Sequence, residues 1–371
     1  MFQAVQTAEN LDAHTDCVHT VATTEDELLL HKKKSNIPFI GIDLLGGDHH
    51  HPEFVMETLL SLYKEIEDPF CLLVFVTPDI RKAIENFQSL HENLIRKDSL
   101  FFSEVTEVIH MDDDPLAAIR RKKESSLSLS IRFLKEGKID ALVTTGNTGA
   151  LIACAHLNLP FLKGITRSAL MTLLPTKQSQ LAVLDVGANV ECTPETLVQF
   201  AHMGIAYQKS RGHSHPRVGL LNIGSEEKKG RLDLREAYKR LLKLNQEGTP
   251  PTFIGNVEGK EIFSGDVDIL VTDGFTGNVF LKTAEGISSF ILDTLHENQS
   301  ILPFSKMLIE RLEKKLYSAE YPGALLCGID GLIMKCHGDS GSEALKNGVY
   351  GAIRLVNDQV ISKMKKELEF A

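Results

Sequence analysis

The sequence predicts an α/β fold organised around a doubly wound, mostly parallel sheet. Short apolar runs recur along the chain, bounded by charged or glycine-containing residues, as is typical of buried strands. Most of them lead into a turn rich in Gly, Asn or Asp and then into a segment with helical spacing of its apolar residues. Strands and helices that alternate in this way form parallel sheets covered on both faces. Ligands bind at the carboxyl ends of such strands, so we expect these turns to gather at that edge of the sheet.

Composition excludes several classes of protein. The 371 residues can bury one large core or two lobes. The formal net charge of −10 disfavours general nucleic-acid binding. Six cysteines without CxxC spacing indicate a reducing cytoplasm and predict neither a metal site of zinc type nor a disulfide framework. No apolar run approaches the ~20 residues that span a bilayer, and the N-terminus lacks the residue order of a signal peptide.

The globular part is predicted to begin at residue 37 and to run to residue 371. Residues 1–36 are polar and lack a sustained apolar period, so we expect a disordered extension, with a terminal helix as the alternative. Adjacent residues of the triplet His49–His51 cannot all face one ion from regular structure, so we expect a solvated loop there rather than a metal site. The first strands are expected at Phe39–Ile42, Cys71–Thr77 and Val105–Met111, and the first helices up to about Lys64 and at Asp79–Gln88.

Acidic and basic residues follow the third expected strand. Asp112–Asp114 carry three carboxylates that would suit a divalent cation, but acidic residues before a proline are common at helix starts, and we favour that role. The next predicted helix, Leu116–Gly137, carries the basic run Arg120–Lys123. This run is either a solvated helix face or a landing surface for an acidic partner.

Glycine-rich turns follow the later strands. These strands are expected at Asp140–Thr144, Gln180–Leu184, Val218–Asn222, Phe253–Ile254 and Ile269–Val271. A strand that feeds such a turn into a helix leaves backbone N–H groups free, and these groups and the helix dipole favour an anion. After the last strand, Thr276 or Asn278 is expected to cap the helix, and Lys282 lies one turn further on.

A helical hairpin is predicted at about residues 287–317. Apolar residues with helical spacing lie on both sides of an apolar tip formed by Ile301, Leu302 and Phe304. A hairpin packed in the core or forming a dimer is one interpretation, and a tip that touches a membrane is the other.

Several well-known motifs are absent from the sequence. It contains no GxGxxG after a strand, no GxxxxGK[ST], no GxSxG and no HExxH. The residues by themselves therefore indicate an α/β enzyme that handles a phosphate-like anion without a nucleotide signature.

The motifs, in this order, resemble those of the bacterial PlsX family, the phosphate acyltransferases. The matching segments are Asp43–Asp48 (DLLGGD), Thr145–Leu151 (TGNTGAL), Leu184–Glu195 (LDVGANVECTPE), Gln199–Tyr207 (QFAHMGIAY), Pro216–Gly230 (PRVGLLNIGSEEKKG), Phe253–Gly259 (FIGNVEG), Val271–Gly286 and Cys336–Ser340 (CHGDS). The resemblance covers roughly residues 37–355. It implies a Rossmann-like fold, akin to the isocitrate and isopropylmalate dehydrogenases and to phosphotransacetylase, and a homodimer without a cofactor. One departure is Ser168, which stands where the family often has proline after Arg167.

The resemblance also implies an activity. The chain would make acyl phosphate from acyl-acyl carrier protein and inorganic phosphate, and a membrane glycerol-3-phosphate acyltransferase would use this product in phospholipid synthesis. Phosphate would attack the thioester directly, so positioning and oxyanion stabilisation would supply most of the rate.

The residues expected to perform this chemistry are spread over the glycine-rich turns. Two residues are expected to be catalytic: His337 would protonate the leaving thiolate or orient phosphate, and Lys228 would supply charge together with Lys282. Asp185 and Asp273 would hold turns or orient a lysine. The expected phosphate and oxyanion donors are Asn147, Thr148, Gly187, Asn189, Asn256, Thr276, Gly277 and Asn278. A helix dipole near Cys192 would lower the pKa of its thiol, but we expect a packing residue there and not an acyl acceptor.

Two other functions remain open from the sequence. A decarboxylating dehydrogenase of the related fold would need NAD and a metal, for which only Asp112–Asp114 give a hint. A non-catalytic scaffold would hold enzymes of lipid synthesis at the membrane through the apolar tip of the hairpin.

Overall fold

The computed structural model describes residues 28, 32, 37–48, 51–95, 99–246, 252–297, 305–316, 323–338 and 341–369. Within them, eleven strands form one sheet in the order β3-β2-β1-β4-β11-β10-β5-β6-β9-β7-β8. The strands are β1 (Phe39–Asp43), β2 (Cys71–Val76), β3 (Leu100–Glu104), β4 (Ala141–Thr144), β5 (Ala169–Pro175), β6 (Gln180–Leu184), β7 (Val218–Leu221), β8 (Phe253–Val257), β9 (Ile269–Val271), β10 (Ala324–Cys327) and β11 (Leu332–Lys335). The predicted α/β, mostly parallel fold is confirmed.

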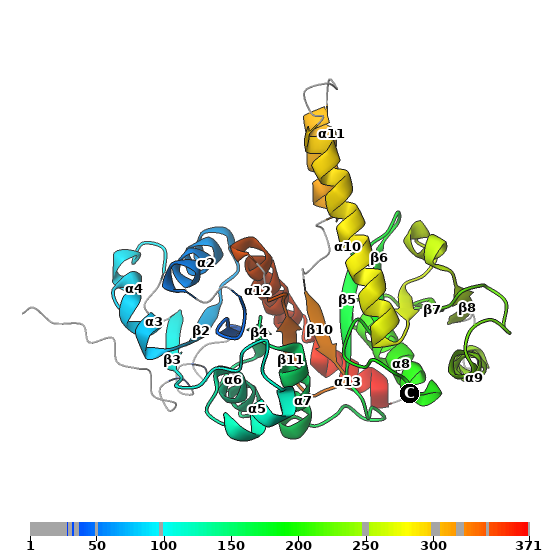
Figure 1. Cartoon of the computed structure of the whole chain (residues 1–371), viewed down its shortest axis with the longest axis horizontal. Coiled ribbons are helices and arrows are strands. Elements are labelled where there is room, and N and C mark those ends of the chain that lie inside the picture. The colour runs from blue at the N-terminus through cyan, green and yellow to red at the C-terminus, as the bar shows by residue number, and fades with distance from the viewer. Residues whose placement is uncertain are drawn as a thin grey trace, which may run out of the picture.

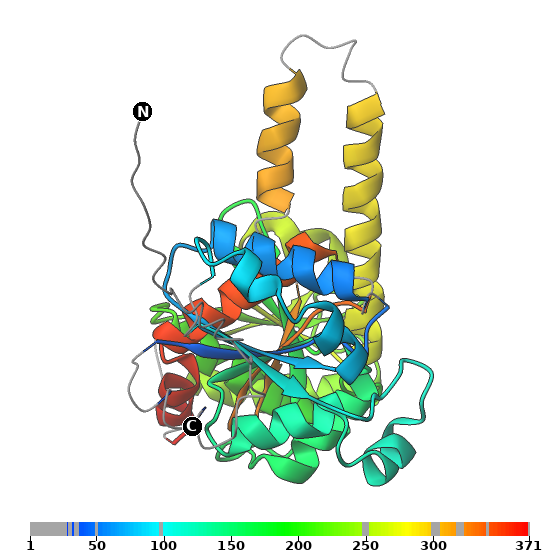
Figure 2. The same cartoon turned by 90° about the vertical axis from the view of Figure 1, so that its left-hand side faces the viewer.

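The helices fill the connections between these strands. They are α2 (Pro52–Glu65), α3 (Pro78–Ala83), α4 (Phe87–Leu90), α5 (Pro115–Arg121), α6 (Ser126–Lys135), α7 (Thr148–Asn158), α8 (Pro194–Ser210), α9 (Leu232–Leu241), α10 (Gly274–Glu297), α11 (Ser305–Leu316), α12 (Ser342–Asn357) and α13 (Val360–Glu369). In the half of the sheet that contains β1, α2 and α12 lie on one face and α5, α6 and α7 on the other, as Figures 1 and 2 show. In the other half, α8 packs on β6 and β9 and against α9 and α13.

The sheet consists of two parallel halves that run in opposite directions. Strands β1, β2, β3, β4 and β11 are parallel to one another, and so are β6, β7, β8 and β9. Between them, β10 is antiparallel to β11 and to β5, and β5 is antiparallel to β6. The expectation that all the turns gather at one edge of one parallel sheet is therefore wrong, because the two halves point their carboxyl ends in opposite directions.

The register of the central strands nevertheless brings the two sets of carboxyl ends together. Lys335, the last residue of β11, pairs with Ala324, the first residue of β10. One residue on, Leu325 pairs with Met171 of β5, and Met171 pairs with Leu184, the last residue of β6. The two halves are thus offset along the strand direction, so that the ends of β11 and β6 lie only two short strands apart.

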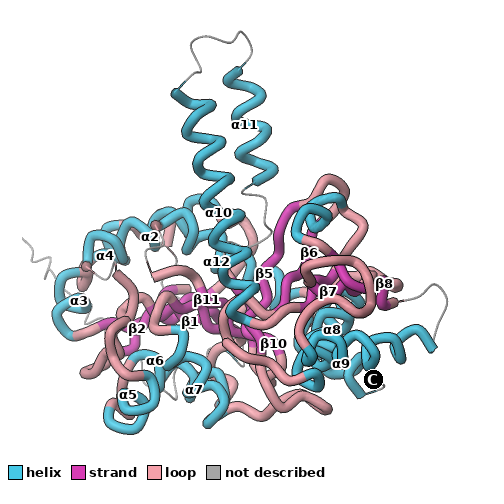
Figure 3. The backbone as a smooth tube through the Cα atoms, turned by 45° about the vertical axis from the view of Figure 1, so that its right-hand side comes forward, coloured by secondary structure: helices cyan, strands magenta, loops and turns pink. Residues whose placement is uncertain are grey.

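The predicted hairpin is confirmed. Helices α10 and α11 lie side by side and project from the body of the molecule, as Figures 2 and 3 show, and His296 Nε2 lies 2.7 Å from Glu313 Oε1 across them. Ile287 and Phe290 are 55% and 71% exposed, so their side chains are not packed in the core. The tip residues Ile301, Leu302 and Phe304 lie outside the described residues, as does nearly all of the predicted extension 1–36.

Other local expectations needed correction. No strand forms at Val105–Met111; the third strand is Leu100–Glu104, and the following segment is irregular. The single helix expected at Leu116–Gly137 is two helices, because Ser125 ends the connection after α5 and caps α6 by accepting a hydrogen bond from Ser128 N. Among the described residues, no helix is long and apolar enough to cross a membrane.

Candidate active site

A cavity of about 240 Å³ lies where the two halves of the sheet meet. Both halves contribute to its wall. The lining residues are Thr148, Leu170, Thr172, Val186, Gly187, Asn278, Leu281, Glu285, Gly323, Ala324, Lys335, Cys336 and His337. The volume equals about eight water molecules at ~30 Å³ each, enough for a small anion and one end of a second reactant.

The wall after β1, β4 and β11 holds a buried lysine and a buried carboxyl group. Lys335 is 8% exposed, and its Nζ donates to Thr145 O at 3.3 Å and to Cys336 O. Asp43 is buried and accepts a hydrogen bond from Thr144 Oγ1 at 3.2 Å. Its carboxyl group also interacts electrostatically with Lys335. Burial raises the pKa of Asp43 although its hydrogen bonds and Lys335 oppose this shift. A cation is thus fixed at the cavity wall beside a carboxyl group.

A second cation reaches the cavity from α10. Lys282 Nζ lies 2.9 Å from Nε2 and 3.2 Å from Nδ1 of His337, and 2.9 Å from Glu285 Oε2. Burial would raise the pKa of Glu285, but hydrogen bonds from His337 and Lys282 lower it, and their effect is the larger. Lys282 Nζ thus lies within hydrogen-bonding distance of both ring nitrogens of His337, and the tautomer of the ring decides which one accepts. This cluster joins the segment after β9 to the segment after β11.

The opposite wall is a turn built around Asp185. The buried carboxylate accepts hydrogen bonds from the backbone N–H groups of residues 170, 187, 188 and 189, and from Asn189 Nδ2. Burial raises the pKa of Asp185 despite these bonds. Gly187 adopts φ 142°, in the region that favours glycine, and lines the cavity beside Asn278. The hydrogen bonds of Asp185 and Asn189 therefore fix the backbone conformation of this turn.

Helix α10 begins earlier than the sequence indicated. It starts at Gly274, and the residue that accepts from the N–H of Thr276 is Asp273, through Oδ1 at 2.7 Å. The expected caps, Thr276 and Asn278, lie inside the first turns of the helix. Asp273 also pairs with Arg231 at 2.8 Å. A Cβ on Gly277 would lie 1.9 Å from Asp185 O, so this glycine lets the helix pack directly against the Asp185 turn.

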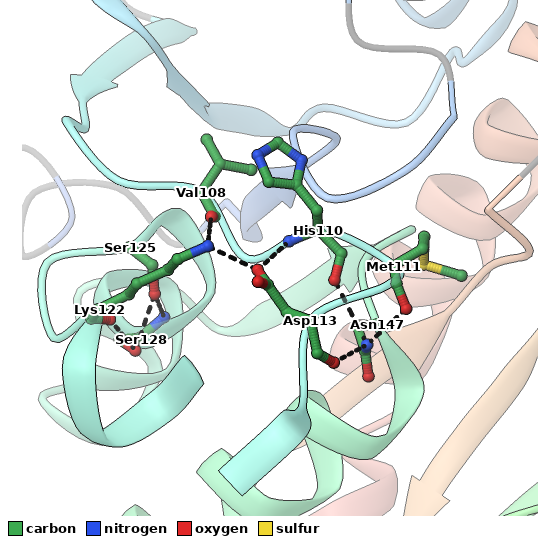
Figure 4. A network of polar contacts seen from close by, with 8 residues as sticks. All are labelled: Val108, His110, Met111, Asp113, Lys122, Ser125, Ser128 and Asn147. Carbon is green, nitrogen blue, oxygen red and sulfur yellow. Dashed lines mark hydrogen bonds and ion pairs between the residues drawn. The ribbon is translucent and has the colours of Figure 1, made fainter. Parts of the chain in front are cut away.

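Nine of the thirteen predicted site residues do not line the cavity: Asn147, Asp185, Asn189, Lys228, Asn256, Asp273, Thr276, Gly277 and Lys282. Asn147 caps α7 through Oδ1, and its Nδ2 donates to the carbonyl groups of residues 110, 111 and 113, as Figure 4 shows. The Asn256 amide joins Glu226 O to Asn222. Lys228 is exposed in the segment between β7 and α9. The amides of Asn147 and Asn256 thus hold backbone segments in place.

Asp112–Asp114 begin a helix, as we favoured. Asp114 caps α5 by accepting from Ala117 N at 2.8 Å, and Pro115 occupies its first turn. Asp113 pairs with Lys122 at 2.6 Å. Among the residues that the structure describes, no three His, Cys, Asp or Glu side chains are grouped as metal ligands would be.

Sequence comparison identifies the family. A family model described as "Fatty acid synthesis protein" matches residues 39–363. The chain is similar to the phosphate acyltransferases of Chlamydia pneumoniae and Chlamydia felis, with 39% identity to each, over 89% of this chain and 98% of each relative. The chain belongs to the PlsX phosphate acyltransferase family. The resemblance deduced from the motifs is confirmed, and with it the assignment to an enzyme family.

Solved structures support the fold. A phosphotransacetylase from Streptococcus pyogenes has a TM-score of 0.57 at 14% identity and covers 91% of this chain and 99% of its own. A 4-hydroxythreonine-4-phosphate dehydrogenase from Klebsiella pneumoniae has a TM-score of 0.51 at 11% identity, and the match covers 87% of this chain and 100% of the dehydrogenase. At this identity the likeness concerns the fold alone, and it agrees with the predicted Rossmann-like α/β fold.

Two charged cavity residues of this PlsX-family chain were not expected from the sequence. Lys335 ends the apolar run of β11 and stands two residues before His337, and a lysine at the carboxyl end of a buried strand was the available signal. Glu285 follows Lys282 at the spacing of side-chain pairs on one helix face.

The departure at Ser168 has a local explanation. Its buried hydroxyl lies 2.6 Å from His156 Nε2, and its carbonyl accepts from Asn189 Nδ2 at 2.8 Å. The Ser168 carbonyl group thus holds Asn189 of the Asp185 turn in place. The hydrogen bond between the Ser168 hydroxyl and His156 restrains this segment, as the ring of a proline would.

Proposed function

We propose that this protein transfers the acyl group of acyl-acyl carrier protein to inorganic phosphate and so makes acyl phosphate. The observation that supports this best is the convergence of Lys335, Lys282 and His337 on one cavity with the Gly187 turn. An anion and the carbonyl group of a thioester would both find donors there. Family membership supports the same reaction class.

Phosphate would bind between the cations and the first turn of α7. Lys335 is held by the backbone carbonyl groups of Thr145 and Cys336, so its position is fixed before an anion arrives. Thr148 stands at the start of α7, where the free backbone N–H groups and the helix dipole favour negative charge. Asn278 and Gly187 form the facing wall. We propose that the thioester oxygen points to the Gly187–Asn189 turn as negative charge develops on it.

The reaction then needs little acid–base chemistry. One oxygen of hydrogen phosphate attacks the carbonyl carbon, a C–O bond forms, and the C–S bond to pantetheine breaks. The proton of the phosphate ends on the leaving sulfur, so that atoms and charges balance. His337 is suited to carry it, because an imidazole ring can accept a proton on one nitrogen and release a proton from the other. Lys228 is exposed in the segment between β7 and α9, so its charge would only attract phosphate as it approaches the cavity.

We propose a cytoplasmic homodimer whose product passes to a membrane glycerol-3-phosphate acyltransferase. The exposed apolar residues of α10, such as Phe290, support an interaction of the hairpin with a second surface. Contact of the tip Ile301, Leu302 and Phe304 with a membrane remains a prediction. Replacement of all three by Ser should release the protein from acidic liposomes while acyl-phosphate synthesis continues. A variant that becomes monomeric would instead make the tip an interface.

The test of the reaction is release of free carrier-protein thiol from palmitoyl-acyl carrier protein, with and without inorganic phosphate. We expect release only with phosphate, and an equal amount of acyl phosphate trapped by hydroxylamine. Thiol release without phosphate would make the protein a thioesterase. Reduction of NAD with a 2-hydroxy acid would favour the dehydrogenase alternative. Asp112–Asp114, its only hint in the sequence, are engaged in capping and in the pair with Lys122.

A further inference from the structure

The segment 110–115 lies beside the cavity without lining it, and we call this segment the rim. Its Met111 side chain lies over Gly338, because Met111 Cε is 3.2 Å from the place that a Cβ on Gly338 would occupy. Its Pro115 packs on the first turn of α7, with Pro115 Cγ 2.8 Å from the corresponding place on Gly149. Gly338 follows His337 and Gly149 follows Thr148, and both of these residues line the cavity. A surface that begins at this rim therefore lies next to the reacting groups.

This rim continues into a basic surface, which consists of Met111, Leu116, Arg120, Arg121 and Lys123. All five residues are exposed, and the two apolar ones are 46% and 56% exposed. Leu116 and Arg120 stand four residues apart on α5 and so share one helix face. Within the described part of the chain, Arg120, Arg121 and Lys123 form no ion pair with an acidic side chain. Three uncompensated cations are thus concentrated beside the cavity of a protein whose formal net charge is −10.

The fourth residue of the basic run fixes this surface to the rim. Lys122 Nζ donates to Val108 O at 2.8 Å and to Asp113 Oδ2 at 2.6 Å, as Figure 4 shows. Asn147 holds the same segment from the α7 side through three carbonyl groups. The hydrogen bond of Ser128 Oγ to Lys122 O connects the end of α5 to α6. Ordered contacts on both sides pre-organise the surface, which reduces the loss of entropy when a partner binds.

We infer that this basic surface is the docking site for the acidic protein that carries the acyl thioester, an inference that rests on the proposed function. Charge complementarity selects the partner: an acidic helix would meet Arg120, Arg121 and Lys123, and its apolar residues would meet Leu116 and Met111. A carrier bound here stands at the rim between Thr148 and His337, so its prosthetic arm enters the cavity directly. Of the acidic neighbours, Glu124 is paired with Arg132, Asp113 is paired with Lys122, and Asp114 caps α5, while Asp112 is exposed beside Met111.

The experiment compares two acyl donors in two charge-reversed variants. The test variant is Arg120→Glu with Arg121→Glu, and the matched control is Lys239→Glu with Lys243→Glu, which makes the same charge change at exposed positions of α9 and the turn after it. The donors are palmitoyl-acyl carrier protein and the small thioester S-palmitoyl-N-acetylcysteamine. We expect the test variant to lose about 10- to 100-fold in kcat/KM for the carrier-bound donor, the range of electrostatic steering. Its kcat/KM for the small thioester, and both values in the control, should stay unchanged.

Each other outcome has a defined meaning. An equal loss with both donors, or an equal loss in the control, would overturn the docking site. Loss of binding to phosphatidylglycerol vesicles with unchanged carrier kinetics would assign the surface to a lipid and overturn it as well. If the wild-type protein turned over neither donor, the proposed function would fail, and direct titration with fluorescent acyl carrier protein would then decide the docking. If the test variant no longer binds acyl carrier protein and the control variant still does, the docking site is supported. If both variants bind it, the docking site is overturned.

Discussion

Lys282 Nζ lies 2.9 Å from Nε2 of His337, although the two residues come from opposite halves of the sheet. Lys282 belongs to the helix after β9, and His337 follows β11. The contact therefore links the two halves of the sheet beside the cavity, in the region where the strand direction reverses. It makes the position of the candidate proton carrier depend on the packing of both halves.

The first prediction concerns this contact. Lys282→Met should lower kcat/KM for phosphate by about 10²-fold, the scale of one lost electrostatic donor, and His337→Gln should have a similar effect. Because the two residues act as a unit, the double variant should lose less than the product of the single losses. Steady-state kinetics with varied phosphate measures this. Fully multiplicative losses would show that the two side chains act independently.

The same variant should change the acid response of the protein. The pKa of Glu285 is lowered from its ordinary value of 4.5 by the bonds from His337 and Lys282, which outweigh burial. A lowered folded-state pKa contributes stability that is present above the ordinary value and is lost as the pH falls through the lowered one. Lys282→Met removes part of this contribution, so the melting temperature of the variant should fall less steeply below pH 4.5 than that of the wild type.

The second prediction concerns Gly277. A side chain there would meet the backbone oxygen of Asp185 at 1.9 Å, and neither backbone segment can move cheaply. Gly277→Ala should destabilise the protein by about 1–3 kcal/mol and reduce activity in parallel. Gly286→Ala on the same helix is the matched control, because nothing lies within 4 Å of its Cβ position. That variant should be slightly stabilised by the higher helix propensity of alanine. Thermal unfolding of both variants decides the point; an intact Gly277→Ala protein that requires more phosphate would place Gly277 at the anion instead.

The sequence predicted most of the parallel strands because they are short apolar runs, but it misplaced β3 and did not identify β11 as a strand. The strands Gln180–Leu184 and Ile269–Val271 were placed with their observed bounds. It did not predict the antiparallel strands β5 and β10, although these two strands reverse the sheet and join its halves. Their residues carry no pattern that distinguishes a reversing strand from a connecting segment, and pairing direction depends on contacts between distant parts of the chain.

The side chains of the candidate site, too, were only partly predicted from the sequence. His337, Gly187, Asn278 and Thr148 were predicted and line the cavity, and Lys282 was predicted and contacts His337. Asn147 and Asn256 were predicted as donors to an anion on residue type alone, and only the folded arrangement shows that their amides hold backbone carbonyl groups. Donors in turns have the same sequence signature whether they serve a ligand or the loop itself.

The third prediction separates the roles of Lys335 and Asp43. Lys335→Met removes the positive charge that opposes the burial-raised pKa of Asp43 and the hydrogen bonds of Nζ to two backbone carbonyl groups, so the protein should be destabilised by about 1–3 kcal/mol. The double variant Asp43→Asn with Lys335→Met should regain much of this stability, because no unpaired charge remains buried. Its phosphate KM should still be raised at least about 10-fold, since the loss of one charged contact of about 1.5–3 kcal/mol has this effect. Urea unfolding and phosphate kinetics measure the two roles. Recovery of phosphate binding in the double variant would make Lys335 a structural residue only.

The last prediction concerns Cys192, which distinguishes direct attack by phosphate from an acyl-enzyme. The sequence suggested that a nearby helix dipole would lower the pKa of this thiol. The structure contradicts this: burial, and then the charges of Asp185 and Asp273, raise its pKa to about 12. Its Sγ lies 3.8 Å from Asn189 O, to which the thiol donates. Because the thiolate is the reactive form, the thiol is not activated at neutral pH.

Cys192→Ser should therefore keep its turnover within about two-fold, the scale of a substitution that removes no transition-state contact. Wild-type protein incubated with radiolabelled palmitoyl-acyl carrier protein in the absence of phosphate should carry no label after denaturation. Alkylation of Cys192 by iodoacetamide should be slow at pH 8 and should accelerate as the pH approaches the raised pKa, because the thiolate fraction grows with pH. Label that remains on the denatured wild-type chain and is lost from the serine variant would establish a covalent intermediate in place of direct attack.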